Sequence, residues 1–111
     1  MHLHMAEQIR SLAENRFGRN GRLPLLLAHA WPAFYLGSVA ADCQELAGIP
    51  RTATHFYNIP PEPDNQAYPR MLAAYPELAD LSGTSPEQAV FVAAYSVHLM
   101  MDLVWFRDIL L

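Results

Sequence analysis

The first part of the chain alternates apolar and polar residues with a helical period. Between residues 2 and 16, apolar side chains recur at intervals of three and four, with charged and amide side chains between them. This spacing places one apolar stripe along an α-helix, so we expect a helix here, ended by the turn-forming residues 18–21. The apolar positions of this stripe are Leu3, Ala6, Ile9, Leu12 and Ala13.

A second apolar region begins at Pro24 and predicts two helical segments. Pro24 suits the first turn of a helix, and Pro32 ends or kinks it because proline lacks the amide hydrogen that a helix interior needs. The second segment, residues 33–41, contains Gly37 and Ser38. These small residues predict a point of close packing between helices.

Residues 42–66 change character and show no sustained periodicity. The region carries one glycine and four prolines, which predicts a long proline-rich loop. Loops of this length are uncommon in small domains unless they have a function. A short helix is expected over residues 65–75, and the stretch 79–84 follows it as a break.

The last region carries the clearest helix start. Ser85 suits the N-cap, Pro86 the first helical position and Gln88 the reciprocal capping position. From Ala89 to Leu111 the chain is almost wholly apolar, so we expect one long final helix. The chain shows no sustained strand-like alternation. The fold class is therefore predicted as all-α, a small bundle of about four helices in one domain over residues 1–111.

Composition narrows the possible partners. The net charge is −4 and no basic patch is evident, which argues against nucleic acid as a partner. The hydrophobic fraction is 52% with 16% charged, and this surplus fits a buried central helix or a homo-oligomer formed through apolar helices. Cys43 is the only cysteine, which excludes an internal disulfide. With no signal peptide evident and Asp102 inside the long apolar run, we expect a cytoplasmic protein with at most peripheral membrane contact.

The long apolar run contains two ionisable residues four positions apart, His98 and Asp102. Residues at this spacing share one face of a helix. Burying either group unpaired is costly, so the pair requires compensation, from an ion pair or from a metal ion. Asp42 and His55 in the loop region add one carboxylate and one imidazole. Such a mixed nitrogen and oxygen set suits Zn²⁺ or another divalent transition metal, whereas calcium prefers oxygen alone.

Other candidates have simpler interpretations beside the functional ones. His2 and His4 open the first predicted helix two positions apart, so we expect only one of them to face inward. His29 lies between two alanines on an apolar segment, which predicts a core or interface histidine. Arg51 and Arg107 are candidates for binding a phosphate group through two hydrogen bonds, although a surface position is the simpler interpretation of both.

Three segments together resemble the zinc-dependent phospholipase C family, which is related to the single-strand nuclease type of zinc phosphodiesterase. The pattern of that family is an N-terminal His, a Gly-Ser-x-x-Pro-Asp segment, a Thr-His-Phe-like segment and His-x-x-x-Asp on a central helix. The matching segments here are Phe34-Tyr35-Leu36-Gly37-Ser38-Val39-Ala40-Ala41-Asp42, Arg51-Thr52-Ala53-Thr54-His55-Phe56-Tyr57 and Tyr95-Ser96-Val97-His98-Leu99-Met100-Met101-Asp102.

The resemblance implies an all-helical fold and a zinc site. It places one zinc ion on Asp42, His55, His98 and Asp102. It also implies that Asp102 bridges to a second zinc ion held by an N-terminal histidine, His2 rather than His4. Asp42 and Asp102 would then be the catalytic carboxylates. The implied activity is hydrolysis of a small-molecule or lipid phosphodiester by a zinc-activated water.

Two departures from the family pattern limit this expectation. Ala41 stands where the family has proline before the aspartate. The family also has further His and Glu ligands after the His-x-x-x-Asp helix, and none follows Asp102 here. We therefore expect one or two metal ions, in a short family member or the N-terminal portion of a larger family domain. The alternative function is a non-catalytic helical module that keeps only the primary metal site or self-associates.

Overall fold

The computed structural model describes residues 2–57 and 67–110, apart from the side chains of Arg107 and Leu110. The described residues form helices and turns without a strand, which confirms the all-α class. Pro60, Pro61 and Pro63 of the predicted loop lie outside the described residues. The helices are α1 (His2–Phe17), α2 (Arg22–His29), α3 (Trp31–Ala40), η1 (Ala41–Cys43), α4 (Gln44–Ala47), α5 (Thr52–His55), α6 (Ala67–Ala74), η2 (Pro76–Ala79), α7 (Pro86–Trp105) and the π-helical turn η3 (Phe106–Leu110).

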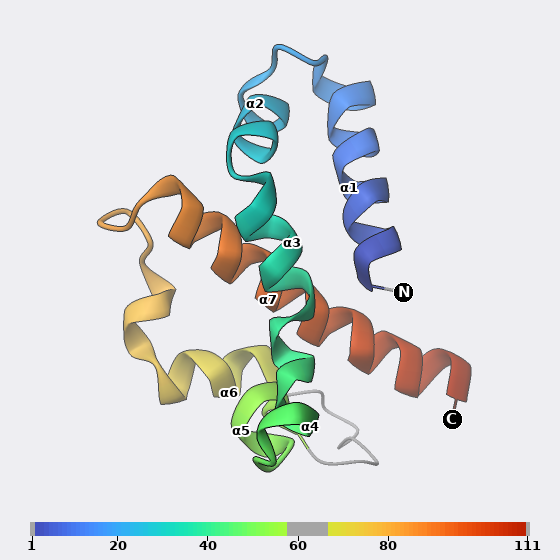
Figure 1. Ribbon diagram of the computed structural model, residues 1–111, viewed down its shortest axis with the longest axis vertical. Coiled ribbons are helices and arrows are strands. Elements are labelled where there is room, and N and C mark those ends of the chain that lie inside the picture. Colours follow the sequence, from blue (N-terminus) through green and yellow to red (C-terminus); the bar gives the residue numbers. More distant parts are fainter. Residues whose placement is uncertain (1, 58–66, 111) are drawn as a thin grey trace.

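The long helix α7 passes through the middle of the molecule and is crossed by α3 (Figure 1). Gly37 lies at this crossing, as the sequence predicted. A Cβ atom there would meet the carbonyl oxygen of Phe91 and would lie 2.8 Å from the Cβ of Ala94. Ser38, beside it, is buried and donates its hydroxyl proton to the Phe34 carbonyl oxygen at 2.8 Å. The two small residues therefore let the backbones of α3 and α7 approach closely.

The helix pair α2 and α3 is bent by 76°, and α1 lies beside both of them (Figure 1). The break falls at Ala30, and Pro32 lies in the first turn of α3, where its missing amide hydrogen costs nothing. The predicted core position of His29 is wrong. Its side chain is 69% exposed and donates from Nε2 to Glu87 at 2.9 Å. The bend turns the end of α2 away from the core and toward the first turn of α7.

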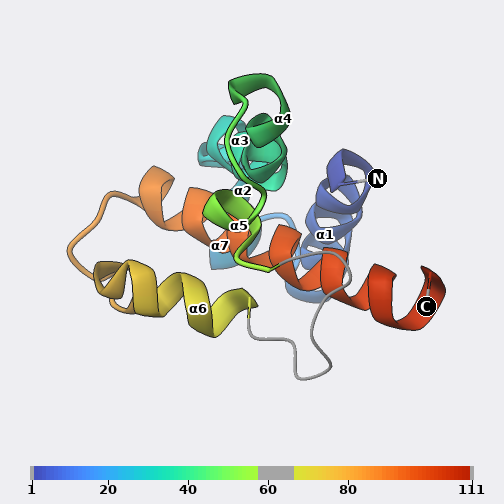
Figure 2. The same ribbon diagram turned by 90° about the horizontal axis from the view of Figure 1, so that it is seen from below.

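Two apolar clusters lie along α7, with contributions from different helices. The first fills the space between α1, α2, α3 and the first half of α7, and the second joins α6 to the second half of α7. Figure 2 shows α6 and α1 along different parts of α7. His98 and Asp102, which are also buried, directly precede Leu99 and Leu103 of the second cluster along α7. The clusters comprise Ala6, Ala13, Leu27, Ala30, Phe34, Val90 and Ala94 in the first, and Tyr57, Ala67, Met71, Leu99 and Leu103 in the second.

The start of α7 is a complete capping box, as predicted. The hydroxyl of Ser85 accepts from the Gln88 backbone N–H at 3.2 Å, and the Gln88 side chain accepts from the Ser85 N–H at 3.2 Å. The long final helix that the sequence predicted ends as α7 at Trp105, and the π-helical turn η3 follows from Phe106. By length and apolar composition α7 qualifies as a membrane span, and so do α2 to α4 taken as one bent span. Of the α7 window, 39% is buried within the fold.

The predicted loop over residues 42–66 is partly wrong. Up to residue 57 this region forms η1, α4 and α5, each about one turn long. A single turn is too short to produce a periodic pattern, and isolated turns are unstable by themselves. Contacts with α7 stabilise α5: the Tyr95 hydroxyl donates to the Thr54 carbonyl oxygen. The consequence is that the end of α5 is held against the centre of α7.

Candidate metal centre

Three elements bring four ionisable side chains together beside the middle of α7. Asp42 comes from η1, His55 is the last residue of α5, and His98 and Asp102 occupy successive turns of α7. One potential ligand atom from each lies within 4.8 Å of the other three. His55, His98 and Asp102 are buried, whereas the side chain of Asp42 is 51% exposed. The structure thus brings together all four residues that the sequence analysis assigned to the first metal ion.

The spacing of the ligand atoms matches a tetrahedral ion. His55 Nε2 lies 3.2 Å from Asp42 Oδ1 and 3.5 Å from Asp102 Oδ2. His98 Nε2 lies 3.4 Å and 3.1 Å from the same two oxygens. Ligands bound to Zn²⁺ at about 2.0–2.1 Å in a tetrahedron are about 3.3–3.4 Å apart. Four of the six edges of the ligand tetrahedron therefore have nearly the length that zinc requires.

The hydrogen bonds of His98 orient its ring for metal binding. Nδ1 lies 2.6 Å from the carbonyl oxygen of Ser38, an acceptor, so Nδ1 carries a proton, and in the neutral ring Nε2 keeps its lone pair. Nε2 is buried and has no hydrogen-bond partner among the described residues. A buried nitrogen without a hydrogen bond is costly, and a cation between it and the two carboxylates would remove that cost. The residues present therefore fit a metal ion.

The position of His55 depends on the residues on either side of it. Thr54 Oγ1 lies 3.0 Å from His55 Nδ1 and 3.4 Å from the Arg51 carbonyl oxygen. When this hydroxyl donates to the carbonyl, it accepts from Nδ1–H, and the lone pair of Nε2 then faces Asp42 Oδ1 at 3.2 Å. Phe56 follows with φ 61°, a left-handed conformation uncommon outside glycine. It ends α5 directly after His55, which turns the chain away from the site.

Burial and neighbouring charges shift the pKa values of the buried groups in the cluster. Burial opposes ionisation of Asp102, but the hydrogen bond from His2 and the adjacent imidazole of His98 outweigh burial and hold its pKa well below the usual range. Burial also opposes protonation of His98, yet Asp102, the Ser38 carbonyl and the charge of Asp42 raise its pKa. Burial and the nearby Arg51 charge lower the pKa of His55. Asp102 is thus held ionised and His55 neutral, which are the forms that bind metal, whereas metal binding by His98 competes with its protonation.

The first turn of α1 adds one histidine to the edge of this cluster. His2 Nε2 donates to Asp102 Oδ1 at 2.8 Å, and His2 Nδ1 lies 3.9 Å from Asp42 Oδ2. Its ring stacks on that of His98 with centroids 3.7 Å apart. His4 is exposed and lies outside the cluster, because residues two apart on a helix face different sides. The structure therefore places His2, and not His4, beside Asp102, to which the resemblance assigns the bridge to a second ion.

Of the two candidate phosphate-binding arginines, the structure describes the side chain of Arg51 alone. The side chain of Arg107 lies outside the described residues. Arg51 lies at the site: Nη2 is 3.5 Å from Asp102 Oδ2 and donates to the Tyr57 hydroxyl at 2.9 Å. Its guanidinium also lies over the Tyr57 ring, 5.2 Å from the centroid. The Nε of Arg51 is buried without a hydrogen-bond partner among the described residues.

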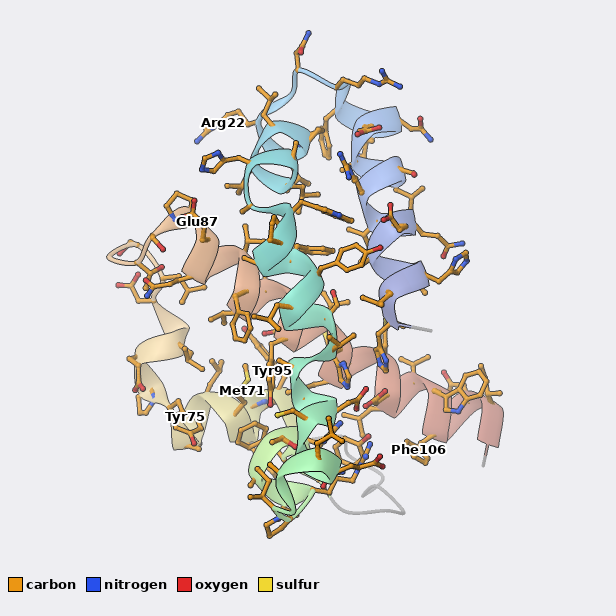
Figure 3. The ribbon with its side chains drawn as sticks, viewed as in Figure 1. Arg22, Met71, Tyr75, Glu87, Tyr95 and Phe106 are labelled. Atoms are coloured by element: carbon orange, nitrogen blue, oxygen red, sulfur yellow. The ribbon has the colours of Figure 1, made fainter. Side chains whose placement is uncertain are left out.

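Several supporting residues could not be recognised as such from the sequence. Ser38 acts through its backbone carbonyl, which no side-chain pattern reveals, and Tyr95 acts by holding α5 through Thr54. Tyr95 also lines a cavity of about 200 Å³ between α5, α6 and α7, whose other lining residues include Phe56, Met71 and Tyr75. Figure 3 labels Met71, Tyr75 and Tyr95. The walls of the cavity are mainly apolar, so it adds no further candidate ligand.

Comparisons of the chain with protein-family models, curated proteins and solved structures found no match. The class of protein is therefore defined by the structure itself. The chain is a small all-helical protein whose central helix carries a largely buried His and Asp cluster with the geometry to hold a metal ion.

Proposed function

We propose that this protein binds a divalent transition metal ion, zinc by preference, through Asp42, His55, His98 and Asp102. The observation that carries this proposal is the buried Nε2 of His98, which has no hydrogen bond among the described residues yet lies 3.1–3.4 Å from two carboxylate oxygens. Two imidazoles and two carboxylates suit zinc better than calcium or magnesium. The Ser38 carbonyl supports the proposal because it fixes the ring in the tautomer that binds metal.

We further propose that the site hydrolyses a phosphodiester, as in the zinc-dependent phospholipase C family that the sequence resembles. The order Asp, His and His-x-x-x-Asp supports this, together with the exposure of Asp42, which leaves the site open on one side. A bound zinc ion would supply positive charge for the phosphate oxygens and make a bound water more acidic. The substrate class is a small-molecule or lipid phosphodiester.

The residues around the cluster suggest how a phosphate group would be held. Arg51 has a buried Nε–H without a partner among the described residues, and Tyr57 holds its guanidinium in place through Nη2. The Arg51 side chain is only 25% exposed, so little solvent competes for its donors. Arg51 is therefore the residue we assign to bind a phosphate oxygen beside the metal site.

His2 suggests a place for a second ion. The oxygens that face His2 are Asp42 Oδ2 and Asp102 Oδ1, whereas the other oxygen of each carboxylate faces His55 and His98. Each carboxylate thus presents one oxygen to each side. His2, Asp42 and Asp102 would hold the second ion, which would add positive charge beside the first.

A second function is favoured by a specific observation. Four protein ligands complete a tetrahedral zinc site, and closed four-ligand sites are typical of structural zinc, whereas catalytic sites keep an open position. The ligands also connect η1, α5 and α7, of which the first two are about one turn long. In this alternative the metal ion stabilises a non-catalytic helical module.

Metal binding is tested on protein purified without chelator. We expect one to two zinc ions per chain by elemental analysis. Zinc titration of the chelator-treated protein should show saturable binding. His98→Ala should weaken zinc binding by about 100-fold or more. Removing a residue that only hydrogen-bonds to a ligand already lowers metal affinity about 10–100-fold. His29→Ala is the matched control, because His29 is exposed and pairs with Glu87. Absence of saturable binding, or equal weakening by both variants, would contradict the site.

Hydrolysis requires a separate measurement. The zinc-loaded protein should cleave bis(p-nitrophenyl) phosphate faster than zinc ions in buffer, and Asp102→Asn should abolish the difference. Arg51→Lys should retain zinc affinity but raise KM, because lysine cannot replace the arginine donors. A zinc-loaded protein that is no faster than buffer supports the structural module and refutes the enzyme.

A further inference from the structure

The exposed face of α7 carries a stripe of apolar residues with regular spacing. Ala93, Val97, Met100 and Val104 follow one another at intervals of four, three and four residues. Ala93, Met100 and Val104 are exposed, and Val97 is partly buried. Intervals of three and four form the seam along which two helices pack side by side. The stripe therefore has the pattern of a helix–helix contact that has no partner within the described residues.

A groove accompanies this stripe where α7 passes the first turns of α1. Its volume is about 420 Å³, and besides the stripe it is lined by Met5, Met101, Trp105 and Ile109. Met100, Val104, Trp105 and Ile109 are 37–60% exposed. Contiguous apolar surfaces of several hundred Å² on a single chain mark sites of interaction. We name the stripe and the groove together the α7 face.

Charge indicates what can cover the α7 face. Between Ala89 and Trp105 the side chains that carry charge near neutral pH are His98 and Asp102, and both are buried. Two copies of this segment can therefore meet without bringing like charges together, although each chain carries a net charge of −4. Helices that lie on membranes carry lysine or arginine on their polar side. The segment 86–105 has neither, and a chain of net negative charge is repelled by anionic lipid.

We propose that the α7 face binds a second copy of this chain, with the two α7 helices packed side by side about a twofold axis near Val97 and Met100. In such a pair the same face meets itself, so each groove receives side chains from the other copy's stripe. The pairing buries Met100, Val104 and Trp105 of both copies. This inference does not depend on the proposed metal site or activity, and its test needs no added metal.

Self-association is measured by sedimentation equilibrium of the full chain from about 1 µM to about 100 µM, a range that resolves the affinities expected of a modest interface. We expect a dimer that dissociates on dilution. Met100→Glu should weaken the dimer at least about tenfold, because it buries a charge in an apolar contact. Leu36→Glu is the control: Leu36 is 59% exposed on α3, outside the α7 face, and its variant should dimerise like the parent.

A second measurement covers the case in which Met100→Glu fails to fold. Met100→Cys in a Cys43→Ser background should be joined into a covalent dimer by a short bismaleimide reagent, whereas Leu36→Cys in the same background should not. A monomer at every concentration would overturn the proposal, and so would cross-linking at Leu36 alone. A monomer that sediments with phosphatidylcholine vesicles would show that lipid covers the face, which also overturns it.

Discussion

The contact at Gly37 permits a quantitative prediction. Replacing it by alanine places a methyl group against the Phe91 carbonyl oxygen and 2.8 Å from the Cβ of Ala94. Both atoms belong to, or are fixed by, the backbone of α7, so no side-chain rotation can relieve the clash. The helices α3 and α7 must separate, and they share the most extensive contact in the fold.

The loss of unfolding free energy caused by Gly37→Ala follows from two opposing effects. Overpacking a close contact costs about 1–3 kcal/mol, and the upper part of this range applies because the obstruction is backbone. Alanine recovers up to about 1 kcal/mol of helix propensity relative to glycine. The net destabilisation for Gly37→Ala is about 2 kcal/mol, which corresponds to a Tm lower by roughly 10 °C in a domain of this size.

Thermal unfolding followed by far-UV circular dichroism measures this change on metal-free protein. Gly83→Ala is the matched control, because a Cβ atom at Gly83 meets nothing within 4 Å. Its Tm should stay within a few degrees of the parent. Separation of the helices also displaces the neighbouring Ser38 carbonyl, so Gly37→Ala should weaken zinc binding about tenfold. A Gly37→Ala protein with the Tm of the parent would refute the reasoning about the crossing.

Three further changes test individual contacts. Tyr95→Phe removes the hydroxyl that holds α5, which should cost about 1 kcal/mol and lower zinc affinity up to about tenfold by calorimetry; unchanged affinity would contradict its positioning role. Ser85→Ala breaks the capping box and should cost about 1 kcal/mol in urea unfolding, whereas an unchanged midpoint would show that the cap contributes nothing. His2→Ala should reduce the number of zinc ions bound at saturation relative to His4→Ala, and equal stoichiometry in the two variants would refute a second ion at His2.

The sequence predicted best those features that depend on local chemistry. The start of α7 follows from Ser85, Pro86 and Gln88, because a capping box needs only residues three positions apart. The close contact at Gly37 follows from a small residue within an apolar helical pattern. His98 and Asp102 share a face simply because they are one helical turn apart.

Features that depend on tertiary contacts were harder to predict. The one-turn helices α4 and α5 leave no periodic signal, since α5 is stabilised by α7 through Tyr95 rather than by its own composition. The apolar neighbours of His29 predict a core or interface position, but the bend at Ala30 exposes its side chain within the chain. Asp42 and His55 lie 40 or more residues from the α7 pair in sequence. Only ligand chemistry and the resemblance to a family pattern linked them to His98 and Asp102.

The central claim is tested most directly by zinc K-edge X-ray absorption of protein loaded with one equivalent of zinc. We predict four nitrogen or oxygen ligands at about 2.0–2.1 Å, with the outer-shell scattering of two imidazole rings and no sulfur. This result corresponds to His55, His98 and one oxygen each from Asp42 and Asp102. A six-coordinate ion surrounded by water, or sulfur scattering at about 2.3 Å from the exposed Cys43, would contradict the site.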